Sequence, residues 1–127
     1  MRITDLKLLP LLAVTRSMIL RAAKRSARAR AMLREEEFTF QIVTTSGIGG
    51  HFVLHNGQLD LHWGRHQKPD FAQIWRSGGD AVRTLTSRDE TAMLRGFEEG
   101  LYRMQGRFAV ALWFNEMMKL ARNPDAC

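Results

Sequence analysis

The stretch 51–63, HFVLHNGQLDLHW, constrains the fold more tightly than any other part of the chain. Asn56-Gly57 separates two runs of alternating residues, and this pair predicts a two-residue type I′ hairpin, because both central residues of that turn need positive φ. The resulting register places the large apolar side chains on one face: Phe52, Leu54, Leu59, Leu61 and Trp63. The opposite face carries the other side chains: His51, Val53, His55, Gln58, Asp60 and His62. We therefore predict a ribbon with one face in water and the other covered by further strands and helices.

The composition is that of one soluble globular domain. The chain has 127 residues, enough for a single core, of which 45% are hydrophobic and 25% charged. Its one cysteine, Cys127, excludes an internal disulfide and a cysteine-based metal site, and it fits a reducing compartment. The longest apolar run, residues 8–14, is far shorter than the ~20 residues that a membrane span needs. We expect a cytoplasmic protein.

Positive charge is concentrated in the first 34 residues. They hold nine Lys or Arg and one Asp, whereas the rest of the chain holds ten basic and twelve acidic residues. Residues 11–34 predict a helix in which basic side chains flank a narrow apolar stripe. It could simply dock with a solvated basic rim, or it could contact anionic lipid or an acidic partner protein through Arg21, Lys24, Arg25 and Arg28. Nucleic acid is disfavoured, because no binding motif or aromatic interleaving accompanies the charge.

The remaining strands follow from alternation. Residues 38–43 read as a half-buried strand, and residues 70–76 predict a fourth strand with Phe71, Gln73 and Trp75 on one face. Residues 101–105 predict a short last strand. The expected organisation is a single domain, residues 1–127, made of a basic helical region (1–37), antiparallel strands (38–76), and helices with one short strand (77–127).

Capping residues predict the helices of the second half. Asp80 is the expected N-cap of a short helix that ends near residue 86. Ser87 and Glu90 then predict a capping box for the next helix, which ends at Gly100 as its C′ residue. A last helix is expected over residues 107–122, before Asn123-Pro124.

The last helix is unusually apolar. Residues 108–114 leave it no polar face in its first two turns, so it is expected to be buried on nearly all sides. Plain core packing explains this pattern, but the surplus of large side chains, including the flexible Met117 and Met118, also fits an apolar cavity or a partner surface.

The order of these elements resembles the sterol carrier protein 2 domain family. The segment 69–75, PDFAQIW, is similar to that family's Pro-Asp strand. The block 92–120 resembles its closing unit, in which a helix ends in a Phe, a Gly opens a short strand and a second Gly leads into an apolar helix, with Phe97, Gly100 and Gly106 at those positions. The long basic helix, the 77–79 Ser-Gly-Gly turn and the absence of a terminal Ser-Lys-Leu address favour the bacterial type.

The resemblance implies an α+β fold, with a five-stranded, mostly antiparallel sheet and helices on one face, enclosing an apolar pocket. It also implies non-catalytic binding of a hydrophobic ligand: a sterol-like lipid, a fatty acyl chain or a quinone precursor, as in accessory proteins of ubiquinone biosynthesis. No cofactor is expected. From the inward positions of the strands and helices, we predict that the ligand pocket is lined by these residues: Phe40, Ile42, Phe52, Leu54, Leu61, Trp63, Phe71, Gln73, Trp75, Phe97, Trp113, Phe114 and Met117.

Other functions find less support in the residues. His51 and His62 are expected as cross-strand neighbours, but no Cys or spaced carboxylates accompany them, so we predict no metal site. No nucleophile motif or phosphate-binding glycine loop is present, so we predict no enzyme activity. Gln73 is expected either to bond to backbone or to meet a ligand headgroup. The alternative function is a protein interaction module, in which the last helix forms a homodimer or a complex.

Overall fold

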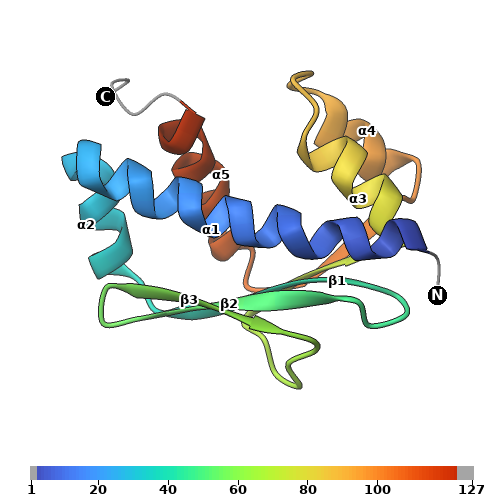
Figure 1. The fold of residues 1–127 in the computed structure, drawn as a ribbon, viewed down its shortest axis with the longest axis horizontal. Helices are drawn as coiled ribbons and strands as arrows, with labels where there is room; N and C mark the ends of the chain where they lie inside the picture. Colours follow the sequence, from blue (N-terminus) through green and yellow to red (C-terminus); the bar gives the residue numbers. More distant parts are fainter. Residues whose placement is uncertain (1–2, 123–127) are drawn as a thin grey trace.

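The computed structural model describes residues 3–122, with side chains from Asp5 onward. A five-stranded sheet in the order β3-β2-β1-β4-β5 forms one layer, and the helices pack on one face of it (Figure 1). The strands are β1 Phe38–Thr44, β2 Gly49–His55, β3 Gln58–Trp63, β4 Phe71–Trp75 and β5 Tyr102–Gly106. The helices are the 3-10 helix η1 Ile3–Lys7 and the α-helices α1 Leu8–Arg25, α2 Ala27–Glu35, α3 Gly78–Leu85, α4 Ala92–Glu98 and α5 Phe108–Arg122. The predicted α+β class is confirmed.

The hairpin forms as the Asn-Gly pair predicts. Asn56 and Gly57 have φ of 52° and 79°, and the register pairs Leu54 with Leu59 and His55 with Gln58. Phe52, Leu54 and Leu59 are buried. Trp63 is 55% exposed, because it lies at the end of the outermost strand, opposite Gly50.

One strand pair is parallel. β1 pairs antiparallel with β2 and parallel with β4, so the chain must cross the sheet between β3 and β4. The connecting residues 64–70 run over the face opposite the helices (Figure 1). There the backbone N–H of His66 donates to Gln41 Oε1 at 2.5 Å. Gln41 and His51 are therefore buried, and the expectation that this face would meet only water is wrong.

The predicted single N-terminal helix is two helices. Ser26 has φ −118° and ψ 119°, an extended conformation that separates α1 from α2. Its Oγ accepts a hydrogen bond from the N–H of Ala29 at 3.1 Å. Serine is a strong N-cap residue, so Ser26 begins a new helix at a point where the apolar periodicity of the sequence had predicted that one helix continues.

The caps of α3 and α4 differ in part from those predicted. Ser77, three residues before the predicted cap, is the N-cap of α3, and Asp80 lies in its first turn. The predicted capping box of Ser87 is wrong, because its Oγ accepts from Asp89 N while α4 begins at Ala92 without a side-chain cap. Gly100 follows the end of α4 with φ 76°, as predicted.

The expectation that α5 is buried on nearly all sides is wrong. Phe108 and Leu112 are 53% and 59% exposed, whereas Val110 and Met117 are buried. Trp113 is buried as well, and its Nε1 donates to the backbone oxygen of Met32 in α2 at 3.0 Å. Helix α5 thus packs with one side on the sheet and neighbouring helices and leaves an apolar strip uncovered. Between residues 3 and 122, no helix combines the length and the hydropathy needed to cross a bilayer.

Candidate functional site

An aromatic cluster lies between the sheet and α5. The ring of Phe40, on the central strand, lies 4.7 Å from that of Phe114 and 5.4 Å from that of Phe71, both close to edge-on. Phe52 joins from β2, with its ring centroid 6.5 Å from Phe40. Alternation along three strands points these rings to one face, which explains why the sequence could identify them. Edge-to-face rings of this kind pack as a continuous apolar interior.

A second group of rings lies at the far end of β4. Trp75 stacks on Tyr102 of β5 at 4.4 Å, and Phe97 of α4 lies 5.7 Å from Tyr102. The Tyr102 hydroxyl donates to the backbone oxygen of Met93 at 3.0 Å. Burial raises the pKa of the Tyr102 phenol, because the phenolate would lose its hydration. Sequence reasoning missed Tyr102, although the alternation of Tyr102 and Met104 along β5 was a signal for it.

Gln73 lies between these two groups on β4, and it is 7% exposed. Its Oε1 accepts a hydrogen bond from Trp75 Nε1 at 3.2 Å. The predicted inward orientation is confirmed, but the partner in the structure is a side chain, whereas the two predicted alternatives were a backbone group and a ligand headgroup. The glutamine therefore satisfies a buried indole N–H in otherwise apolar surroundings.

The structure brings together most of the predicted ligand-contacting residues. Eight lie in the main hydrophobic core and are buried: Phe40, Ile42, Phe52, Leu54, Phe71, Trp75, Trp113 and Met117. Leu61 and Phe114 pack against that core and are partly buried. Phe97 is 47% exposed and reaches the interior through Tyr102, whereas Trp63 lies apart at the sheet edge. Contact of these residues with a ligand stays a prediction.

Two of the hollows on the surface of the described residues both differ from the predicted apolar pocket. The larger, with a volume of about 900 Å³, lies where η1 meets the start of α3, and polar side chains dominate its lining: Asp5, Lys7, Thr45, Ser46, Arg76, Ser77, Asp80 and Arg83, with Gly79 and Val82. The smaller, about 390 Å³, lies between α1 and β3 and includes Arg16, Asp60, Leu61 and His62. Of the predicted ligand contacts, Leu61 alone lines either hollow.

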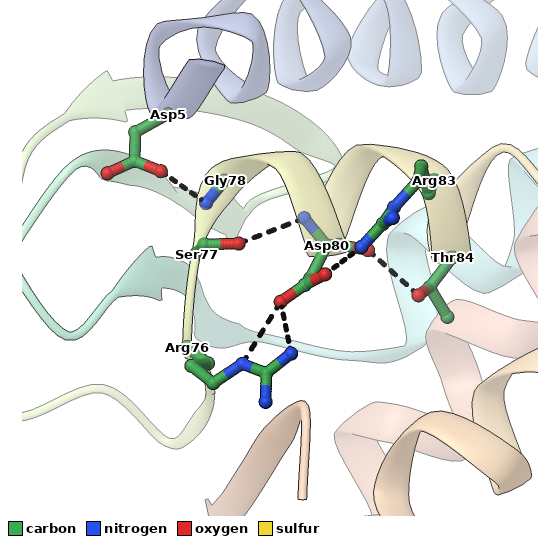
Figure 2. A network of polar contacts seen from close by, with 7 residues as sticks. All are labelled: Asp5, Arg76, Ser77, Gly78, Asp80, Arg83 and Thr84. Atoms are coloured by element: carbon green, nitrogen blue, oxygen red, sulfur yellow. Dashed lines mark hydrogen bonds and ion pairs between the residues drawn. The ribbon is translucent and has the colours of Figure 1, made fainter. Parts of the chain in front are cut away.

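A polar network organises the larger hollow (Figure 2). The Asp80 carboxylate accepts from Arg76 Nε and Nη2 at 3.2 and 3.0 Å and from Arg83 Nη2. Burial of Asp80 raises its pKa, but the hydrogen bonds from Arg76 and Ser77 and the two positive charges outweigh burial, so the pKa lies below its usual value. A carboxylate held ionised between two guanidinium groups is a poor proton acceptor, so this arrangement is suited to holding structure and not to acid–base chemistry.

The same network joins η1 to α3. Asp5 Oδ1 accepts from the N–H of Gly78 at 2.7 Å, and Ser77 Oγ accepts from the N–H of Asp80 at 3.1 Å (Figure 2). A Cβ atom on Gly78 would lie 2.3 Å from the Cα of Asp5, so the two segments are in direct backbone contact. Sequence reasoning assigned Asp80 to capping and missed its arginine partners, which the i,i+3 spacing to Arg83 and the i,i+4 spacing from Arg76 could have indicated.

Three histidines meet beneath the sheet. His51 stacks on His62 across β2 and β3 at 5.4 Å, as the predicted register requires, and its ring lies 5.1 Å from that of His66. His51 Nδ1 lies 3.0 Å from the backbone oxygen of Gly64. In the described part of the chain, no group of three or more His, Cys, Asp or Glu side chains is arranged to hold a metal ion.

The predicted docking residues lie on the surface where α1 ends and α2 begins. All four side chains are exposed, and none takes part in an ion pair among the residues that the structure describes: Arg21, Lys24, Arg25 and Arg28. Arg16, earlier in α1, is used differently, since its Nε donates to the backbone oxygen of Leu59 on the edge strand at 2.8 Å.

Comparison with known proteins gives structural matches but no sequence match. No protein-family model matches the chain, and no curated protein matches it significantly. The UbiJ-SCP2 ubiquinone synthesis protein superposes with a TM-score of 0.64 at 19% identity, over 88% of this chain and 96% of that one. The sterol carrier protein domain 2 of Helicoverpa armigera gives 0.59 at 16% identity, over 95% and 92% of the two chains. A crystal structure of sterol carrier protein 2 gives 0.52 at 18% identity, over 87% and 95%. The chain therefore has the fold of the sterol carrier protein 2 domains.

Proposed function

We propose that this protein binds a hydrophobic ligand between the inner face of the sheet and the helices, without catalysing a reaction. The observation that carries the proposal is the aromatic interior around Phe40, Phe71 and Trp75, in which Gln73 is a single inward amide on β4. Burial of ligand surface at about 25 cal/mol per Å² would supply the affinity, and the amide would discriminate among ligands. The fold shared with sterol carrier protein 2 domains supports this proposal.

The interior has side chains that can make room for a ligand. Phe114, Met104 and Met118 are only partly buried at the border of the core, and two of them are methionines, whose unbranched side chains change shape at low cost. An apolar ligand would replace contacts among these side chains with contacts to itself. The pocket would then form on binding, at the expense of packing in the ligand-free protein.

Native mass spectrometry of the freshly purified protein tests this proposal, followed by organic extraction and identification of the extracted compound. A stoichiometric lipid or quinone precursor is the expected result. A protein without ligand that also fails to bind a fluorescent fatty acid would contradict the proposal.

Among hydrophobic ligands, a quinone precursor is one finer candidate. The structurally similar UbiJ-SCP2 protein is described as a ubiquinone synthesis protein, and this is the support for an accessory role of our chain in that kind of metabolism. Competition between a fluorescent fatty acid and a polyprenylated phenol, measured at equal concentrations, distinguishes an acyl chain from a quinone precursor as the preferred ligand.

The basic surface formed by Arg21, Lys24, Arg25 and Arg28 is proposed to dock on an anionic membrane. Each exposed cation near such a surface adds about 1 kcal/mol of attraction, and these four are not neutralised by carboxylates of the described chain. Docking would bring a carrier to the membrane that supplies or receives its ligand.

An interaction module is the second candidate, and the uncovered strip of α5 favours it. Phe108 and Leu112 lie one turn apart and are both more than half exposed. A stable oligomer in sedimentation that dissociates on Leu112→Gln substitution, with no ligand bound, would support this function over ligand carriage.

A further inference from the structure

We propose that the hydrophobic ligand reaches the interior between α4 and α5, over the Gln73–Met104 pair of β4 and β5. The inference rests on the proposed function, because it assigns an access route to that ligand. Two chains of aromatic rings, the partial exposure of Met104 on the edge strand β5 and the short length of α4 carry it.

The two chains of rings lead from the surface to the sheet. On α4, Phe97 is 47% exposed and touches Tyr102, whose ring stacks on the fully buried Trp75. On α5, Phe108 is 53% exposed, and its ring lies 6.1 Å from that of the buried Phe71. Both chains thus connect solvent with the inner face of the same strand, β4.

The strand register defines which residues lie between the two chains of rings. In the register of β4 and β5, Trp75 pairs with Tyr102 and Phe71 pairs with Gly106, with Gln73 opposite Met104 midway between them. Trp75 and Phe71 are four residues apart, which places them ~13 Å apart at about 3.3 Å per residue. Met104 is only partly buried. A ligand that passed between Phe97 and Phe108 would therefore meet a thioether and an amide.

The two helices on either side are anchored unequally. Helix α5 is held to α2 through the Trp113 hydrogen bond and has its inner side in the core. Helix α4 has seven residues, no side-chain N-cap, and a hydrogen bond from Tyr102 to Met93. So short a helix gains little stability of its own, so we expect local opening of α4 to cost less free energy than opening of α5.

The chemistry of the rim selects an apolar ligand. Leu94 on α4 and Leu112 on α5 are each 59% exposed and extend the apolar surface by one turn beyond the two phenylalanines. Arg95 on α4 is paired with Asp89, so its charge is partly neutralised. Exposed apolar side chains on both helices favour a hydrocarbon chain or ring over a polar molecule.

Stopped-flow uptake of a fluorescent fatty acid tests the route. We expect Leu94→Gln and Phe108→Gln each to slow both association and dissociation about fivefold to tenfold, while the equilibrium affinity changes much less, because these side chains are touched only in passage. Val14→Gln is the matched control, since Val14 is 52% exposed on α1, away from this strand pair. Equal rates in the wild type and in all three variants would overturn the route.

A second measurement keeps the test decisive if a variant fails to fold. In a Cys127→Ser background, a nitroxide label on a cysteine placed at residue 97 or 108 should lose mobility when the fatty acid binds, while a label at residue 14 should not change. Binding that leaves both rim labels unchanged would contradict the route alone. A wild-type protein that binds no fatty acid would contradict the proposed function itself, so the two failures are distinguishable.

Discussion

Among single residues, Gln73 is the one whose role the structure defines most sharply. Alternation along the strand predicted that the Gln73 amide points inward. It could not predict the hydrogen-bond partner, because alternation fixes the face on which a side chain lies and not the group that it contacts. The hydrogen bond of 3.2 Å between Gln73 Oε1 and Trp75 Nε1 makes the amide a structural acceptor as well as a candidate ligand contact.

We predict that Gln73→Leu lowers the free energy of unfolding by about 1–3 kcal/mol, because the buried indole N–H of Trp75 loses its acceptor. Urea unfolding measures the change, and Gln105→Leu on exposed β5 is the matched control. Equal midpoints for the two variants would show that the Trp75 hydrogen bond contributes little.

The ionisation of Asp80 leads us to predict how the free energy of unfolding depends on pH. Its pKa in the folded protein lies below the ordinary value of 3.8, so above that pH the ionised, arginine-paired carboxylate contributes its full stability. As the pH falls through the folded-state pKa, the unfolded chain binds the proton first and this contribution is lost. Asp80→Asn should therefore cost about 1–2 kcal/mol at neutral pH and flatten the acid limb of the stability curve. Urea unfolding from neutral pH to below pH 3.8 measures it, and an acid limb unchanged from wild type would contradict this role.

Tyr102 can be followed directly, because it is the only tyrosine in the chain. Burial raises its pKa, so phenolate absorbance in the folded protein should rise at a pH above the ordinary value of about 10. Unfolding in urea should return the midpoint to that value. A folded-state midpoint at or below it would mean that the Trp75–Tyr102 stack is open to solvent.

Among the elements, the connection from β5 to α5 depends on one glycine. Gly106 has φ 108°, and a Cβ atom there would lie 2.3 Å from the backbone oxygen of Asp70. The same oxygen accepts from the N–H of Arg107 at 2.6 Å, which fixes the start of α5 against the strand that carries Phe71. The sequence indicated this joint through the family resemblance, but the close approach to Asp70 is a tertiary contact.

Gly106→Ala is expected to destabilise the protein by about 3 kcal/mol or more, since it combines backbone strain at positive φ with overlap against a backbone atom. Gly100→Ala is the matched control, because Gly100 also has positive φ, 76°, but nothing lies within 4 Å of its Cβ position. Thermal unfolding of both variants separates strain from overlap. Equal melting temperatures would show that the chain relaxes around residue 106.

At the scale of the whole molecule, the basic docking residues and the largest exposed apolar side chains of the second half of the chain lie on different helices. The basic docking residues are on α1 and α2, whereas the large apolar side chains most exposed in the second half of the chain are on α4 and α5. In Figure 1, the junction of α1 and α2 lies at the opposite end of the molecule from α3 and α4. A carrier built in this way would meet an anionic membrane with one end and its ligand near the other.

Vesicle binding tests this arrangement. Replacing Arg21, Lys24, Arg25 and Arg28 by Gln should abolish most co-sedimentation with vesicles of anionic lipid, and raised salt should weaken wild-type binding in the same assay. The control replaces four other exposed basic residues by Gln: Lys68, Arg88, Arg103 and Lys119. An equal loss in both quadruple variants would indicate an effect of net charge alone, and wild-type binding to neutral vesicles would argue against the basic surface.

The sequence by itself determined the hairpin, the order of strands and helices, and the inward positions on β1, β2 and β4. These features follow from local stereochemistry, since the Asn56-Gly57 turn sets the register and a period of two sets the face. Most of the candidate ligand contacts were predictable for the same reason, while Tyr102 and Met104 were missed although they alternate with Arg103 and Gln105 along β5.

Tertiary structure alone decided which of those surfaces are covered. The parallel pairing of β1 with β4 sends residues 64–70 across the outer face and buries His51 there, and the limited contact area of α5 leaves Phe108 and Leu112 in solvent. Asp80 finds its two arginines only once α3 has formed after β4. Burial depends on segments far apart in sequence, so periodicity shows which side chains are apolar without showing what meets them.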